Sequence, residues 1–386
     1  MFKNKYCRML SFVFTLLIFS TIMLPVGAAE VDNLRNNNKA NRKLFVFNSK
    51  LAEIKGSKDA SISAIKTASD FNGRIYSIIE CSPTGYMIYS NDTAVFVEYA
   101  INSPSPYLNV HENLYYGGPT FYYQIIENKL IHTIQRSEKF DAGYINEFSN
   151  SSKLMYEQLS KIKDVPTLEY VTEGKSSYSS INLAPITPMA YKIYTGKVKN
   201  PEFFRNLSSF GYWGGDKRCP KGCCGFVGLN MLVAYHDKYK NNNIMDDSFW
   251  SNSGKTLLKS GDSSLTKYLF NLDPKASTTS MHIHSVMKQY AKKRKVSVSH
   301  TSLYWGFFND STVRKKIDRN VPVELFGNML NVKDYDSKIN HTVVAFEYRR
   351  STGFLTDKTS YTVHYGWEGY SSVVINITIG SMYCFE

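Results

Sequence analysis

The stretch that decides the fold lies at residues 224–235 and reads CGFVGLNMLVAY. It is almost wholly apolar and continues to Tyr239 without a proline, which predicts a helix buried on most sides. Cys224 opens this run, just after a glycine-containing loop that ends at Gly222. A helix N-terminus carries partial positive charge, which favours a thiolate over a thiol. We therefore predict a helix from Cys224 to Tyr239 with a candidate nucleophile at its start.

A candidate partner for this thiol lies far downstream. His341 precedes the strand-like run TVVAFEY, so its imidazole is expected at the edge of a sheet. Thiol catalysis needs an imidazole close to the thiol, and distant segments of a chain can supply the two groups. A further strand, YTVHYGW at residues 361–367, contains Gly366, which permits close backbone approach, and Trp367, which can shield a hydrogen bond from water.

Residues 191–386 have the size of one domain. Helical patterns come first and strand patterns afterwards, which predicts an α+β fold in which the nucleophile helix packs on an antiparallel sheet. Further helices are predicted at Leu265–Leu272, His284–Lys292 and Asp310–Asp318, and strands at Val321–Phe326, Thr342–Tyr348, Tyr361–His364 and Val373–Ile379.

The first 28 residues have the pattern of a signal peptide. A basic start is followed by an uncharged apolar run from Met9 to Leu24, and small residues at 27–29 offer a cleavage site. An uncleaved membrane anchor is the alternative, but the apolar run is short for a membrane span. We therefore expect a secreted protein with no transmembrane segment after processing.

The segment 29–150 is expected to form a small α+β domain. Ile62–Phe71 has apolar residues at three- to four-residue spacing, which predicts an amphipathic helix. Runs rich in Ile, Tyr, Val and Phe then predict strands at residues 75–79, 86–89 and 94–99. Residues 151–190 are polar and irregular, which is typical of a linker or processing region.

The composition excludes some classes of protein. The chain has 386 residues, of which 43% are hydrophobic and 20% charged, as in globular proteins. The net charge of +13 favours electrostatic association with an anionic cell wall. Nucleic-acid binding is not expected, because the basic residues are scattered apart from the cluster at residues 292–295.

The cysteines and histidines do not predict a metal site. Without Cys7, an odd number of cysteines remains, which leaves one thiol unpaired in an oxidising compartment. Cys219, Cys223 and Cys224 lack a second pair of ligands nearby, and His282 and His284 lack an acidic third ligand. No cofactor is expected. Disulfide pairing among Cys81, Cys219, Cys223 and Cys384 stays open.

The ordered set of motifs resembles a known family. Cys224 to Gly228, followed by Tyr235-His236, resembles the nucleophile helix of streptopain and related bacterial papain-like peptidases. The run VPVEL at residues 321–325, leading to His341, resembles the family's proline-containing strand before its catalytic histidine. The run VHYGWEG at residues 363–369 resembles the family's Asn-Trp-Gly-Trp-Gly segment.

This resemblance implies a papain-like catalytic domain at 191–386 preceded by a prodomain at 29–150. Cys224 is then the nucleophile, His341 its imidazole partner and His364 the group that orients His341, with support from Trp367, Gly366 and Gly222. The prodomain would act as an intramolecular inhibitor of a secreted, thiol-dependent endopeptidase acting on polypeptides.

Two departures from the family pattern keep other functions open. His364 stands where the family has an asparagine, and residues 216–220 lack the glutamine that usually helps bind the oxyanion. A cell-wall peptidoglycan amidase of papain-like fold is one alternative, suggested by secretion and basic charge. A non-catalytic surface-binding protein with a decayed peptidase fold is the other.

Overall fold

The computed structural model describes residues 31–55, 60–127, 129–134, 139–140, 149, 152–153, 155–157, 159–160, 192–207, 210–211, 223–241, 243–275, 279–303, 310–327, 341–353, 356–376 and 380–386. The predicted signal peptide at 1–28, most of the predicted linker and Gly222 lie outside these residues. Within them, no helix combines the length and apolar character needed to cross a bilayer.

The chain divides into two compact units, Met1–Lys50 and Leu51–Glu386. The described part of the first is helical and belongs to α2 (Val31–Lys55), which continues across the boundary. The second unit holds all the strands of the described residues. The predicted division at 29–150 and 191–386 stays a prediction.

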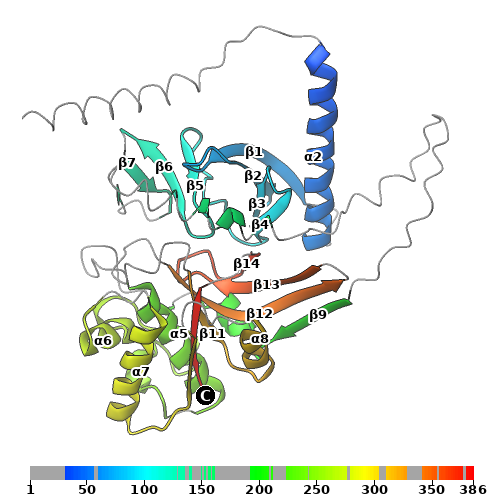
Figure 1. Ribbon diagram of the computed structural model, residues 1–386. Coiled ribbons are helices and arrows are strands. Elements are labelled where there is room, and N and C mark those ends of the chain that lie inside the picture. The colour runs from blue at the N-terminus through cyan, green and yellow to red at the C-terminus, as the bar shows by residue number, and fades with distance from the viewer. Residues whose placement is uncertain are drawn as a thin grey trace, which may run out of the picture. The chain divides into compact units, whose positions relative to one another are not determined.

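One large sheet organises the second unit (Figure 1). Its strands follow the order β10-β15-β11-β12-β13-β14-β4-β3-β2-β1-β5-β6-β7-β8, with β9 paired to β12. All neighbours are antiparallel except β1 and β5. The N-terminal strands are β1 (Ser61–Ser69), β2 (Ile75–Ser82), β3 (Tyr86–Ser90), β4 (Val95–Ala100), β5 (Leu114–Tyr116), β6 (Tyr122–Ile126), β7 (Lys129–His132) and β8 (Lys139–Phe140). The later strands are β9 (Lys192–Lys197), β10 (His300–Leu303), β11 (Val323–Phe326), β12 (Thr342–Gly353), β13 (Thr356–His364), β14 (Val373–Ile375) and β15 (Ser381–Phe385).

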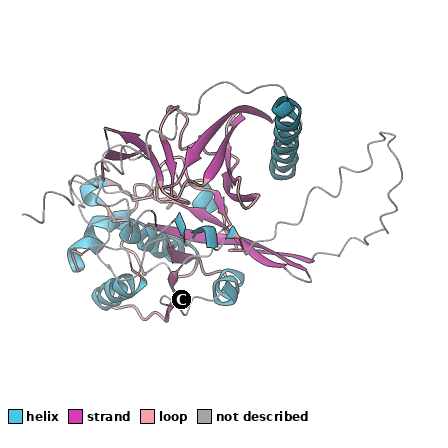
Figure 2. Cartoon of the chain, turned by 45° about the horizontal axis from the view of Figure 1, so that its top comes forward, coloured by secondary structure: helices cyan, strands magenta, loops and turns pink. Residues whose placement is uncertain are grey.

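Helices accompany this sheet, so the predicted mixed α+β class is confirmed (Figure 2). They are α4 (Glu202–Arg205), α5 (Cys224–Tyr239), α6 (Leu265–Leu272), α7 (Ser280–Arg294) and α8 (Asp310–Asp318). The bounds of α5, α6 and α8 agree with the prediction at both ends. Ser264 and Thr279 cap α6 and α7, each accepting a hydrogen bond from a backbone N–H of the first turn.

The predicted amphipathic helix at Ile62–Phe71 is wrong, because this segment forms β1. It pairs with β2 from Ser61 to Ser69, and its exposure alternates with a period of two. Ile65, assumed to face the core, is exposed, whereas Lys66 turns inward to an ion pair of 2.8 Å with Glu80. Long-range pairing with an apolar strand therefore overrides the local three- to four-residue spacing.

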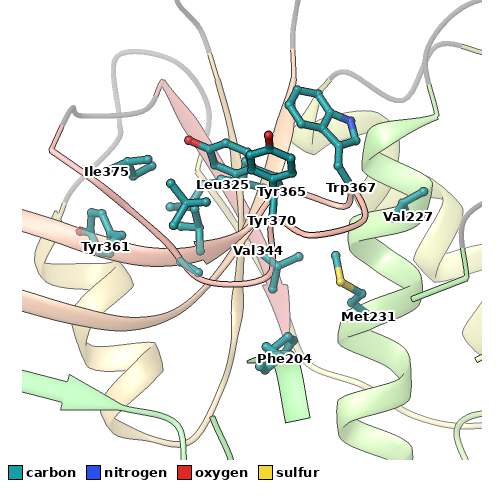
Figure 3. Packing of buried hydrophobic residues seen from close by; sticks show 14 of the residues in the cluster. Phe204, Val227, Met231, Leu325, Val344, Tyr361, Tyr365, Trp367, Tyr370 and Ile375 are labelled. Atoms are coloured by element: carbon teal, nitrogen blue, oxygen red, sulfur yellow. The ribbon is translucent and has the colours of Figure 1, made fainter. Parts of the chain in front are cut away.

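Helix α5 is the centre of the core. Every residue from Gly225 to Asp237 is buried, because β11 and β12 cover one side and α6 and α7 cover another. In Figure 3, Val227 and Met231 of α5 point toward Val344 and Trp367 on the sheet side. This enclosure explains why the helix is apolar all round.

The early and late strands meet at β4 and β14. Ile375 lies opposite Glu98, and Val374 lies opposite Tyr99. The Asn376 side chain extends this junction by donating a hydrogen bond of 2.7 Å to the carbonyl of Phe96. The strands of residues 61–140 and those of residues 192–385 consequently belong to one continuous sheet.

Candidate functional site

The candidate nucleophile lies where helix and sheet meet. Cys224 is the first residue of α5, and Cys223 is its N-cap with a non-helical backbone. Although the residue is partly exposed, burial of the thiol raises the pKa of Cys224 to about 12. Hydrogen bonds with the hydroxyl and the backbone of Thr342 lower the pKa of Cys224 and so oppose this shift. Thr342 therefore lies beside the sulfur.

Thr342 is the link between the two predicted chemical groups. It is the first residue of β12 and follows His341 directly. The sulfur of Cys224 therefore lies against the strand end that carries the imidazole.

A backbone carbonyl orients the imidazole. His341 Nε2 lies 2.9 Å from the carbonyl oxygen of Tyr365, and because a carbonyl only accepts, Nε2 carries the hydrogen. Burial lowers the pKa of His341 to about 4, although this hydrogen bond favours the charged form. The ring is therefore neutral near pH 7, and Nδ1 keeps the lone pair that a thiol proton requires.

Trp367, which was predicted to shield the site from water, lies next to the imidazole of His341. The ring centroids of His341 and Trp367 are 4.5 Å apart, and Trp367 is only 6% exposed. The turn that carries Trp367 needs a glycine at position 366, where φ is +72°. A Cβ there would also come within 3.2 Å of Val227 on α5.

His364 occupies a different place from His341. Its Nδ1 accepts a hydrogen bond of 2.9 Å from the backbone N–H of Gly366, and its ring lies 5.2 Å from that of Phe210. Burial lowers the pKa of His364 to about 3, so it is neutral. The described contacts include no hydrogen bond between His364 and His341. His364 therefore holds the turn that presents the Tyr365 carbonyl, and it is this carbonyl that orients the His341 imidazole.

Three side chains from the early strands reach this site, and sequence reasoning missed them. His132 of β7 lies 5.1 Å from the ring of Trp367, and the charge of His341 influences its pKa. Tyr122 of β6 approaches Trp367 at 6.4 Å. Glu98 of β4 is fully buried. Only Glu98 left a signal in the sequence, as a single acidic residue in the apolar run VFVEYA.

Glu98 lies in a cage of tyrosine hydroxyls. The Tyr122 hydroxyl lies 2.7 Å and 2.9 Å from its two carboxyl oxygens, and the Tyr365 hydroxyl lies 2.5 Å from Oε2. Burial raises the pKa of Glu98 to about 7, while hydrogen bonds from Tyr365 and Tyr122 oppose the shift. Tyr365 thus contacts Glu98 through its hydroxyl and His341 through its carbonyl.

The described residues contain no group of three or more His, Cys, Asp or Glu side chains arranged to hold a metal ion. His282 lies 3.2 Å from Asp273, whereas the His284 ring lies 4.7 Å from that of His300, so the two histidines face different neighbours. Residues 216–220, which include Cys219 and lack the glutamine that usually helps bind the oxyanion, lie outside the described residues.

The chain was compared with protein families, curated proteins and solved structures. No protein-family model matches the sequence, and no curated protein matches it. Among solved structures, the chain is similar to a fragment of prointerpain A from Prevotella intermedia. The match has a TM-score of 0.35 and 9% identity, and it covers 83% of this chain and 98% of that one.

Proposed function

We propose that the protein is a secreted, thiol-dependent endopeptidase with a papain-like catalytic domain, made as a zymogen. One observation carries the proposal: the Cys224 thiol lies against Thr342, the neighbour of His341, and the imidazole is held through Nε2 by the Tyr365 carbonyl. A nucleophile next to a base, with the base held by an orienting group, is the arrangement that acyl transfer requires.

The reaction follows from these positions. His341 Nδ1 takes the thiol proton as the Cys224 sulfur bonds to the peptide carbonyl carbon. The same proton passes to the leaving amine as the C–N bond breaks, which leaves a thioester on Cys224. Water then attacks the thioester carbonyl while His341 accepts a proton from it, the C–S bond breaks, and the acid product leaves as His341 returns the proton to the Cys224 sulfur. The backbone N–H at the start of α5 is suited to stabilise the oxyanion.

The early strands would act as the intramolecular inhibitor. Their residues His132 and Tyr122 pack against Trp367, next to His341. In the buried site, the raised pKa of Cys224 and the lowered pKa of His341 both favour the neutral forms. Cleavage within 151–190 and departure of this region would admit substrate and water, which favours the thiolate–imidazolium pair.

Substitution of Cys224 tests the proposal. Cys224→Ala should abolish hydrolysis of casein and self-processing, whereas Cys223→Ala, on the adjacent thiol, should retain both. An epoxide inhibitor of thiol peptidases should label Cys224 in the processed protein. Processing or casein cleavage by Cys224→Ala would overturn the mechanism.

The same preparations address the other two functions. Release of peptides from purified peptidoglycan without casein cleavage would identify a cell-wall amidase. A processed protein that takes up no label at Cys224 and cleaves neither substrate would be a non-catalytic binding protein.

A further inference from the structure

Besides Glu98, Glu324 has a fully buried carboxyl group, and it packs against α5, the helix that begins at Cys224. Glu324 is in the middle of β11, where its neighbours Val323 and Leu325 are apolar and equally buried. Neither carboxyl oxygen has a hydrogen-bond partner among the described residues. Glu98, by contrast, receives hydrogen bonds from two tyrosines. Neither carboxyl group takes part in the reaction proposed above, and Glu324 also forms no hydrogen bond with the described residues that hold His341.

The position of Glu324 is set by helix α5. A Cβ at Gly228 would lie only 2.6 Å from Glu324 Oε1, so the carboxyl group packs against bare helix backbone at this glycine. Gly228 is four residues after Cys224, which is about one helical turn. Burial is the main cause of the raised pKa of the Cys224 thiol, and a negative charge on Glu324 adds a smaller increase, so the two groups lie within electrostatic range of each other.

The surroundings offer Glu324 no compensating charge. Strand β12 contributes Val344, directly opposite, and Thr342 from the same pairing. Strand β15 contributes Tyr383, whose pKa the Glu324 charge raises, and α5 contributes Cys224. None of the described cationic side chains forms an ion pair with Glu324. A carboxylate buried without a partner is strongly disfavoured, and burial raises the pKa of Glu324 well above its ordinary value.

We propose that Glu324 is a positioning residue for Cys224, and that these two side chains together carry at most one negative charge. Cys224 then becomes a thiolate only while Glu324 holds its proton. The physical reason is the repulsion between two like charges that share a buried space, which makes their titrations interdependent. The inference deepens the proposed function, since it concerns the ionisation that a nucleophilic Cys224 requires.

The pH dependence of alkylation tests this coupling. The rate at which iodoacetamide modifies Cys224, read by mass spectrometry of the peptide that contains it, reports the thiolate fraction. In Glu324→Gln, the half-maximal rate should move to lower pH by about one unit or more, which gives about tenfold faster alkylation on the rising limb. Asp310→Asn is the matched control, because the pKa of Asp310 is also raised by burial but its charge has no resolved effect on Cys224.

The alkylation profiles of the Glu324 variants either support or overturn the coupling between Glu324 and Cys224. A folded Glu324→Gln protein whose alkylation profile coincides with that of the unmodified protein overturns the proposal. Glu324→Met should give the same shift as Glu324→Gln. Failure of both variants to fold also overturns it, because the Glu324 carboxyl oxygens have no hydrogen-bond partner among the described residues to lose and both replacements have a similar length. Alkylation does not depend on hydrolysis, so a shift in a protein that cleaves no casein would support this coupling and reject the peptidase function.

Discussion

The Tyr365 hydroxyl donates a 2.5 Å hydrogen bond to the buried carboxyl of Glu98, although the two residues are 267 positions apart. The carbonyl of the same tyrosine accepts the Nε2 hydrogen of His341. One residue therefore joins an early strand of the sheet to the candidate catalytic imidazole. We therefore expect a displacement of Glu98 on β4 to affect His341 through Tyr365.

Replacing Tyr365 by phenylalanine should have two effects. Loss of a donor to the buried Glu98 carboxyl should lower the free energy of unfolding by about 1–3 kcal/mol, measured by urea denaturation. The ring of His341 should also titrate at a different pH in an NMR experiment. Tyr122→Phe is the control, because Tyr122 donates to Glu98 but makes no hydrogen bond to His341. An unchanged His341 titration in Tyr365→Phe would contradict the link.

The Glu98 carboxyl should make the fold less stable as the pH rises. Its pKa in the folded protein is about 7, above the ordinary value of 4.5, so the folded state binds the proton more tightly than the unfolded state. This contribution is fully present below pH 4.5 and is lost as the pH rises through 7. Unfolding in urea at a series of pH values should show a loss of up to about 3 kcal/mol.

Glu98→Gln isolates this contribution from that of the histidines. Burial lowers the pKa of His236 and His364 to about 3, so their contribution has the opposite sign and is lost as the pH falls below 6.5. The difference between Glu98→Gln and the unmodified protein should therefore change between pH 4.5 and 7. A difference that stays constant over this interval would show that Glu98 has an ordinary pKa.

His364→Asn distinguishes the two ways of orienting His341. Because the Tyr365 carbonyl already occupies Nε2, and Asn can still accept from the Gly366 N–H, casein hydrolysis should fall less than about tenfold. His341→Ala, which removes the base itself, should lower it by about 10²–10⁴-fold. Equal losses in the two variants would assign His364 a direct catalytic part.

Gly366→Ala should disturb the contact between the tryptophan turn and α5. The substitution imposes both a left-handed backbone on alanine and a close contact with Val227. Gly73→Ala is a matched control, because its φ of +76° is similar but a Cβ there meets nothing within 4 Å. The free energy of unfolding should fall by about 1 kcal/mol more in Gly366→Ala than in Gly73→Ala. Equal losses would show that the turn adapts freely.

Local patterns predicted the elements around the candidate site. An uninterrupted apolar run starting at Cys224 predicted α5, and β-branched residues after His341 predicted β12. Both signals depend on residues close together in the chain. Short strands such as β10 and β15 were missed, because four or five residues carry little periodicity and form a strand only by pairing with distant segments: β15 pairs with both β10 and β11.

The sequence by itself determined the mixed α+β class, the helix that begins at Cys224 and the strand that follows His341. Tertiary structure alone decided that Ile62–Ser69 is a strand, that the Tyr365 carbonyl holds His341, and that Glu98 and Glu324 lie buried near the candidate residues. The physical reason is the separation along the chain over which each interaction acts. Helix and strand preferences act over a few residues, whereas the protonation and hydrogen bonding of a buried carboxyl depend on groups that only the folded chain brings together.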